Sequence, residues 1–171
     1  MIRAATAADA AAIVAIYNYY IKNTAVTFEE APLAAADMAQ RIATIIADYP
    51  WLVFERGARV FGYAYASRFH ARSAYRFTVE TTVYVAHDAH RGRIGTELYG
   101  TLIDRLRARN LHRALGVIAL PNEASVGLHE KLGFRKVGET EEVGWKFGRW
   151  INVGYWQLAL ERTPPSVQRS S

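Results

Sequence analysis

The chain has 171 residues, of which 51% are hydrophobic and 22% charged, and it carries a formal net charge of +5 and no cysteine. Such a length and composition are typical of one globular domain with a full core, and no apolar run approaches the roughly 20 residues that a membrane span needs. The lack of cysteine excludes disulfides, thiolate metal sites and a cysteine nucleophile, and it suits the cytoplasm. We therefore expect a cytoplasmic protein without membrane contact, with one domain over residues 1–162 and a disordered tail over 163–171.

The first part of the chain predicts a short strand over residues 2–5, a helix up to about Asn23 and a second helix from Leu33 that ends before Pro50. Five apolar residues of the first helix share one face, which must pack against a core, and they occupy positions 13, 16, 17, 20 and 21. Phe28 lies in the loop between the two helices. Most loop aromatics are simply packed, but such loops commonly form one wall of a pocket, so Phe28 is a candidate substrate contact.

Two β-rich runs, 51–55 and 59–69, are separated by a connection of hairpin length. They are followed by a short basic and aromatic segment over 70–76. The planar guanidinium of Arg72 in this segment suits bidentate pairing with a carboxylate, although a solvent-exposed connector explains the same residues. Arg72 is therefore a candidate for binding an acidic group.

The next strand, over 79–85, contains an acid. Its β-branched residues alternate with Glu80, Thr82 and Tyr84, so a carboxylate lies inside a strand. A basic turn with two glycines then leads into a helix over 96–110. Because the first amides of a helix have no partner within it and lie at the positive end of its dipole, this turn predicts an anion site. An ordinary strand-to-helix loop is the alternative, since the turn has neither the GxGxxG nor the P-loop pattern.

The segment after this helix predicts a strand over 112–118, parallel to the preceding strand by the strand–helix–strand rule. A helix over 123–132 follows, and Gly133 ends it. Asn122 is a good N-cap for that helix, and this structural role would explain it by itself. His129 lies within the helix, where a lone histidine is more often structural than catalytic.

Two antiparallel strands, 134–141 and 151–160, complete the predicted sheet, joined by a loop of glycine and aromatic residues over 143–150. Part of the positive charge is concentrated in the basic turn, the helix after it and its exit, at Arg91, Arg93, Arg105, Arg107, Arg109 and Arg113. A small polyanionic cofactor explains these residues locally. A nucleic-acid partner is the rival interpretation, but the sequence has no zinc spacing, recognition-helix pattern or aromatic-interleaved basic run, so we expect none.

This order of elements, with a basic glycine turn after the fourth strand, resembles the GNAT superfamily of N-acetyltransferases. Four separated blocks are similar to its phosphinothricin and methionine sulfoximine acetyltransferases: YPWLV (49–53), ARSAYRFTVETTVYV (71–85), LPNEASVGLHEKLGF (120–134) and VGYWQ (153–157). The likeness covers nearly the whole chain to about residue 160. It implies an α/β (α+β) GNAT fold, with a mixed central sheet of about seven strands, a splayed pair formed by the fourth and fifth strands, and about four helices.

The resemblance also implies that acetyl-CoA lies in the gap between the splayed strands, with no metal. Pantetheine contacts are implied at Val83, Tyr84 and Val85, and a further cofactor contact at Asn122. The pyrophosphate would bind the backbone of the basic turn, at Arg91, Gly92, Arg93, Ile94, Gly95 and Thr96.

The basic turn departs from the superfamily pattern Q/R-x-x-G-x-G/A at two positions. Here His90 replaces the first residue, and Arg93 replaces the first glycine. A side chain at position 93 would crowd the pyrophosphate or require a φ that only glycine tolerates cheaply. Because Gly92 is adjacent and an added arginine favours phosphate, we expect cofactor binding to survive.

By the same resemblance, Glu80 is the general base that takes a proton from the attacking amine, and partial desolvation in a cleft raises a carboxyl pKa toward the useful range. We expect direct transfer, because the sequence suggests no nucleophile for an acetyl-enzyme, with a backbone N–H of the splayed strand stabilising the oxyanion. His129 stands where many superfamily members have a tyrosine that protonates the leaving thiolate. It is a candidate acid or a residue of the substrate cleft.

The implied substrate is a small amino acid of the phosphinothricin or methionine sulfoximine type, acetylated on its α-amine. Arg72 would bind its carboxylate, and Phe28, Tyr75 and Lys146 would line the pocket. A homodimer is also implied, with the aromatic loop over 145–150 at the contact. The alternatives are an acetyltransferase for another amine (a polyamine, an antibiotic or a protein N-terminus) and a non-catalytic acyl-CoA-binding module.

Overall fold

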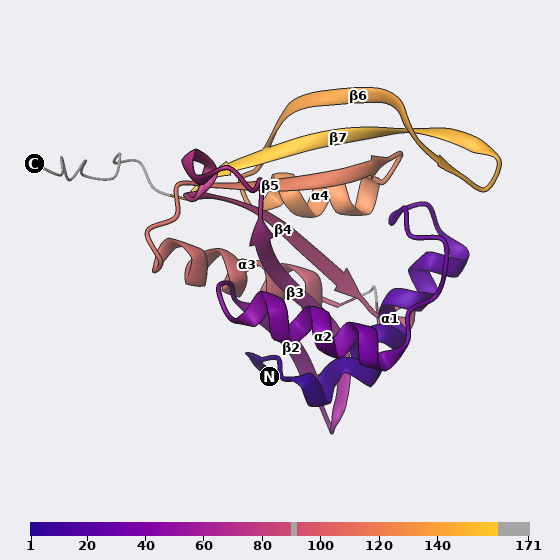
Figure 1. Ribbon diagram of the computed structural model, residues 1–171, viewed down its shortest axis with the longest axis vertical. Coiled ribbons are helices and arrows are strands. Elements are labelled where there is room, and N and C mark those ends of the chain that lie inside the picture. Colours follow the sequence, from indigo (N-terminus) through magenta and orange to yellow (C-terminus); the bar gives the residue numbers. More distant parts are fainter. Residues whose placement is uncertain (90–91, 161–171) are drawn as a thin grey trace, which may run out of the picture.

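A seven-stranded sheet, with the strand order β1-β2-β3-β4-β5-β7-β6, forms the centre of the computed structural model, which describes residues 1–89 and 92–160 (Figure 1). The strands are β1 (Ile2–Ala4), β2 (Trp51–Arg56), β3 (Arg59–Arg68), β4 (Thr78–Val85), β5 (Arg113–Leu120), β6 (Arg135–Lys146) and β7 (Arg149–Ala159). The described α-helices are α1 (Ala10–Asn23), α2 (Ala35–Ile46), α3 (Ile94–Arg107) and α4 (Glu123–Lys131). None of these four helices is long and apolar enough to cross a membrane. The arrangement confirms the predicted mixed α/β fold, while the predicted tail over 163–171 lies outside the described residues.

The helices pack on opposite faces of the sheet. Along β2, Trp51 and Val53 belong to a core shared with α1 and α2, whereas Leu52 and Phe54 belong to a second core shared with α3. This alternation follows from the two-residue period of a strand. The five apolar positions predicted on α1 are all buried in the first of these cores. Leu128 of α4 packs against the second core, so α3 and α4 cover the same face.

Strands β4 and β5 are parallel, as predicted, but they pair over a short distance only. Their Cα partners are Thr78↔Arg113, Val79↔Ala114 and Glu80↔Leu115. Beyond these pairs, β4 continues along β3 and β5 continues along β7. The two strands therefore separate after Glu80, and this splay is the one that the family resemblance implies.

The C-terminal hairpin differs from the prediction. Residues 143–150, expected to form a loop, belong mostly to β6 and β7, whose pairing continues to Trp145↔Trp150 and Lys146↔Arg149. The turn consists of Phe147 and Gly148, with φ of 52° and 72°. Two successive positive φ values match the twist of a two-residue hairpin. The prediction was wrong because Gly144, Trp145 and Trp150 occupy paired strand positions, so only Phe147 and Gly148 remain as the turn.

Candidate active site

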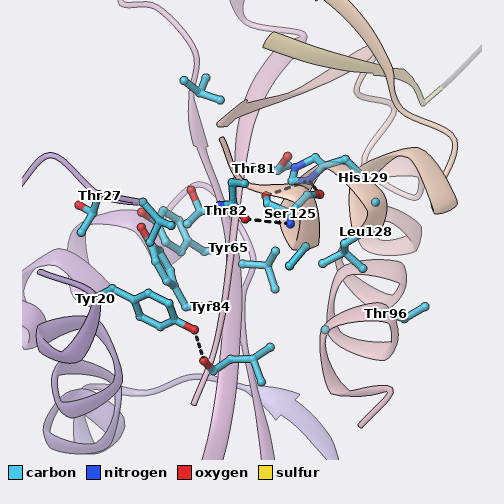
Figure 2. Close-up of a pocket in the computed structure, with 18 of the residues that line it drawn as sticks. Tyr20, Thr27, Tyr65, Thr81, Thr82, Tyr84, Thr96, Ser125, Leu128 and His129 are labelled. Atoms are coloured by element: carbon cyan, nitrogen blue, oxygen red, sulfur yellow. Dashed lines mark hydrogen bonds between the residues drawn. The ribbon is translucent and has the colours of Figure 1, made fainter. Parts of the chain in front are cut away.

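The separation of β4 and β5 leaves a cleft of about 590 Å³. Its walls come from β4, the first turn of α3, α4 and the loop between α1 and α2, with Tyr84, Thr96, His129 and Thr27 contributed by these elements (Figure 2). Figure 2 places Thr27 and Thr96 on opposite sides of the cleft. The size falls within the range of small-molecule and cofactor sites, so this cleft is the candidate active site.

Glu80 lies where β4 and β5 begin to separate, and its half-buried side chain lines the cleft. Its neighbour Val79 packs in the core with α3, so strand alternation directs Glu80 to the opposite face. Desolvation raises the pKa of this carboxyl above its usual value, while the charge of His70 opposes the rise. A carboxylate in this environment is suited to accept a proton from a group bound in the cleft.

His129 lines the opposite wall of the cleft, yet only 4% of its surface is exposed. Its Nδ1 lies 2.8 Å from the carbonyl oxygen of Ser125, which can only accept, so Nδ1 carries a proton. Nε2 lies 2.9 Å from the hydroxyl of Tyr99, which in turn lies 2.7 Å from Oγ1 of Thr81. Burial lowers the pKa of His129, and this effect outweighs the opposing bond to Ser125. The imidazole is therefore neutral, and Tyr99 donates to it.

The start of α3 forms another part of the cleft, lined by Gly95 and Thr96 of its first turn and by Gly92 just before the helix. The first amides of this 14-residue helix have no acceptor within it, and they lie at the positive end of its dipole. Arg93 precedes the helix with φ −78°, which any residue adopts, so position 93 does not need glycine. The predicted contact at Arg91 lies outside the described residues. This end of the cleft is suited to an anion.

Comparison with known proteins agrees with this geometry. Residues 2–153 match the family model described as an Acetyltransferase (GNAT) domain. The chain belongs to the GNAT acetyltransferase family. A phosphinothricin N-acetyltransferase of Streptomyces viridochromogenes is 42% identical over 164 residues, which cover 96% of this chain and 90% of the relative.

Two further relatives of this GNAT acetyltransferase are similar over nearly their whole length. An L-methionine sulfoximine/L-methionine sulfone acetyltransferase of Pseudomonas paraeruginosa is 40% identical, and the match covers 95% of each chain. The crystal structure of a phosphinothricin acetyltransferase from Sinorhizobium meliloti, in complex with acetyl-CoA, is 35% identical with a TM-score of 0.91. That match covers 99% of this chain and 95% of the other.

The predicted cofactor residues of this GNAT acetyltransferase fall into two groups. The first group lines the cleft and consists of Val83, Tyr84, Val85, Gly92, Gly95, Thr96 and Asn122. Asn122 is also the N-cap of α4, because its Oδ1 accepts from the backbone N–H of Ser125 at 3.1 Å, which confirms the predicted structural role. Arg93 and Ile94 do not line this cleft within the described residues, and Ile94 is buried in the core with α3.

Two of the predicted substrate residues, Arg72 and Tyr75, lie in the exposed segment before β4. Neither lines the cleft as the described residues form it. The ring of Tyr75 packs edge-on against Phe69 and His70, at centroid distances of 5.7 Å and 5.0 Å. The charge of His70 influences the pKa of Glu80, so His70 lies near that carboxyl. The segment that contains Arg72 and Tyr75 therefore adjoins the acid end of the cleft, which is the part lined by Glu80. Carboxylate binding by Arg72 stays a prediction.

The other two predicted substrate residues, Phe28 and Lys146, contact each other's segments and not the cavity. Lys146 is 2% exposed, and its Nζ donates to the carbonyl oxygens of Thr27 and Glu29. Phe28 packs on the backbone of Gly144, which precedes Lys146 by two residues in β6. The prediction that Lys146 lines the pocket is therefore corrected: its ammonium group is used by the loop between α1 and α2.

The sequence interpretation missed several residues of the site. Tyr17 and Tyr20 line the cleft, although the α1 periodicity marked them as core alone. Tyr65 of β3 lies beside Thr82 of β4 and also faces the cleft. The available signal was the hydroxyl that each of these side chains carries at a core position, since a buried tyrosine hydroxyl usually has a polar partner. Tyr99 was missed for the same reason.

Proposed function

We propose that this chain transfers the acetyl group of acetyl-CoA to the α-amine of a small amino acid of the methionine sulfoximine or phosphinothricin type. The observation that carries the proposal is Glu80, a half-buried acid with a raised pKa at the point where β4 and β5 open into a cleft. The names of the Streptomyces and Pseudomonas relatives support the substrate class. The acetyl-CoA complex of the Sinorhizobium protein supports the donor.

The donor would lie along the edge of β4 that β5 has left, with its pyrophosphate at the first turn of α3. Val83, Tyr84 and Val85 line this part of the cleft, and Gly92 and Gly95 leave room for a close approach to the backbone. The exposed side chain of Arg93 adds positive charge beside the turn without straining the backbone. The positive charge of Arg93 and the amides of the first turn of α3, which have no acceptor within the helix, together favour a bound pyrophosphate.

In the proposed reaction, Glu80 removes a proton from the ammonium group of the amino acid. The free amine attacks the thioester carbon, a backbone N–H of β4 stabilises the oxyanion, and the C–S bond then breaks. After the attack the nitrogen loses a second proton, coenzyme A leaves as a thiolate that takes up one proton, and Glu80 releases the other to solvent, so atoms and charges balance. The chain has no cysteine that could carry the acetyl group, which agrees with direct transfer.

His129 has two candidate roles, and the geometry favours the structural one. Its single proton, on Nδ1, is donated to Ser125, and its Nε2 accepts from Tyr99. Protonating the thiolate would therefore need a second proton on the ring, which burial disfavours. We propose that His129 forms a rigid wall of the cleft.

We also propose a homodimer, with the aromatic tip of the β6–β7 hairpin at the contact. Trp145, Phe147 and Trp150 are 52%, 59% and 58% exposed. Three large exposed aromatics at the end of one hairpin are typical of a protein interface. Light scattering on the purified chain tests this proposal, because Trp150→Lys should shift the molecular mass toward that of a monomer.

A panel of amines scored by release of free thiol from acetyl-CoA tests the function. The panel contains L-methionine sulfoximine, phosphinothricin, a polyamine, an aminoglycoside and a peptide with a free N-terminus. We expect the first two to be acetylated with the highest kcat/KM. Faster turnover of another amine on the panel would show that the proposed substrate class is wrong and that the enzyme acts on that amine instead. Acetyl-CoA binding without thiol release from any amine would instead support a non-catalytic acyl-CoA-binding module.

A further inference from the structure

We propose that Lys146 and Gly144 of β6 are positioning residues for the amino-acid substrate, because they hold the loop between α1 and α2 against the acid end of the cleft. This inference rests on the proposed function. The loop, residues 24–34, contains neither helix nor strand in the described structure, so, besides local bonds to the hydroxyls of Thr24 and Thr27, its tertiary contacts determine where it lies. Figure 1 shows it beneath the turn of the β6–β7 hairpin.

The first contact is a buried ammonium group. Nζ of Lys146 donates to the carbonyl oxygen of Thr27 at 2.7 Å and to that of Glu29 at 2.9 Å. The same Nζ lies 5.2 Å from the centroid of the Phe147 ring, within the range of a cation–π contact. An ammonium group is rarely buried without such compensation. Lys146 is thus fully used in joining a hairpin to a loop more than a hundred residues away in the sequence.

The second contact is the ring of Phe28 on the backbone of Gly144. A Cβ atom added at position 144 would lie 2.2 Å from Cζ of Phe28, so the ring would have to shift. Gly144 is not among the glycines with positive φ, so the backbone itself would accept alanine. The ring of Phe28, and not the conformation of the strand, is the reason that position 144 suits glycine.

The held loop forms part of the wall of the cleft that Glu80 also lines. Thr27 lines the cleft, and its Oγ1 lies 2.7 Å from the hydroxyl of Tyr17. Tyr17 also donates to the carboxylate of Glu29 at 3.0 Å, and that carboxylate is paired with Arg41. The loop is therefore fixed by α1 and α2 on one side and by β6 on the other. Shifting it would move Thr27 relative to Glu80 and misplace an amine bound between them.

The position of these contacts predicts a selective defect. Lys146 and Gly144 act on the wall that contains Thr27, whereas the first turn of α3, with Thr96, lies on the other side of the cleft (Figure 2). Release of the loop should therefore weaken productive binding of the amino acid and leave acetyl-CoA binding intact. Substitution of a residue that merely stabilised the whole fold would not weaken amino-acid binding while leaving acetyl-CoA binding unchanged.

The test uses Gly144→Ala, with Gly138→Ala in the same strand as the matched control, since a Cβ at position 138 would meet no atom within 4 Å. We expect Gly144→Ala to raise the KM for L-methionine sulfoximine about 10-fold or more, by analogy with other misplacements of about 1 Å. The acetyl-CoA Kd from calorimetry should stay within about twofold. The control, Gly138→Ala, should match the wild type in the KM for L-methionine sulfoximine and in the Kd for acetyl-CoA. Lys146→Met, which keeps the aliphatic stem, should behave as Gly144→Ala does.

Two further measurements complete the test. In the double variant Phe28→Ala/Gly144→Ala the clash is gone, so its KM should equal that of Phe28→Ala alone. Hydrogen exchange without any substrate should rise at amides 26–30 in Gly144→Ala and Lys146→Met. An active Gly144→Ala enzyme with an unchanged KM and unchanged exchange would overturn the inference. A wild type inactive with every amine would overturn the proposed function instead, and exchange alone would then decide whether the hairpin holds the loop.

Discussion

The hydroxyl of Tyr99 lies 2.9 Å from Nε2 of His129, and this contact joins α3 to α4 beneath the cleft. Both side chains are buried, and the Tyr99 hydroxyl also lies 2.7 Å from Oγ1 of Thr81, which donates to the carbonyl oxygen of Leu115 on β5 at 3.0 Å. Strands β4 and β5 are thus also linked by a side chain of β4, just beyond the end of their short ladder. Each link in a buried polar chain is costly to remove, because its partner is left unsatisfied.

The neutral state of His129 predicts how stability depends on pH. Its pKa in the folded protein lies below the ordinary value of 6.5. The unfolded chain therefore binds the proton first, and the free energy of unfolding should fall as the pH is lowered from about 6.5 toward the folded-state pKa. Urea denaturation at several pH values between 7.5 and 5 measures this slope. His129→Gln should have a shallower slope over the same interval; an identical slope would contradict the assignment.

A substitution at Gly116 of β5 tests how tightly the imidazole of His129 is packed. A Cβ at position 116 would lie 2.3 Å from Nε2 of His129, so Gly116→Ala must displace the imidazole and break its bond to Tyr99. We expect a loss of about 1–3 kcal/mol in the free energy of unfolding, as for other overpacked cores. Gly100→Ala in α3 is the control, because a Cβ there would meet nothing within 4 Å. That control should gain about 0.5–1 kcal/mol, the ordinary helix preference of alanine over glycine.

Glu80→Gln tests the proposed base. The amide keeps the shape of the side chain but cannot take a proton, so kcat should fall by about 10²- to 10⁴-fold. Because burial raises the pKa of Glu80, the acidic limb of the wild-type pH–rate profile should lie above the ordinary value of 4.5 and vanish in the variant. Calorimetry should give the same acetyl-CoA affinity for both proteins. An unchanged rate and profile would remove Glu80 from the mechanism.

Replacing Arg93 with the glycine of the superfamily pattern tests how this residue affects acetyl-CoA binding. Its φ of −78° shows that glycine offers no conformational advantage at this position. Arg93→Gly should therefore weaken acetyl-CoA binding about 2- to 5-fold through the loss of one exposed charge. Arg93→Lys, which keeps the charge, should bind nearly as the wild type does. Tighter binding by the glycine variant in calorimetry would show that the arginine crowds the cofactor.

Two kinds of feature could be predicted from the sequence: those that depend on the hydrophobic periodicity of one element, and those implied by the family resemblance over most of the chain. The two-residue alternation in β4 correctly set Glu80 apart from Val79, and the spacing on α1 correctly marked a buried stripe. Helix ends were less accurate, since α2 begins at Ala35 and not at Leu33. The link between Tyr99 and His129 was not predictable, because it joins residues of different elements and nothing in either local pattern encodes the other. The hairpin at Phe147 was misread for a related reason: a glycine in a strand and one in a turn look alike until the pairing is known.

The short ladder between β4 and β5 has a thermodynamic consequence. Three residue pairs join two halves of the sheet, so few main-chain bonds oppose their separation. A molecule that lies across the gap and touches both halves would act as a reversible cross-link. At a concentration 100 times its Kd it would add about 2.7 kcal/mol to the free energy of unfolding. The melting temperature of the protein should accordingly report occupancy of the site even when no reaction takes place.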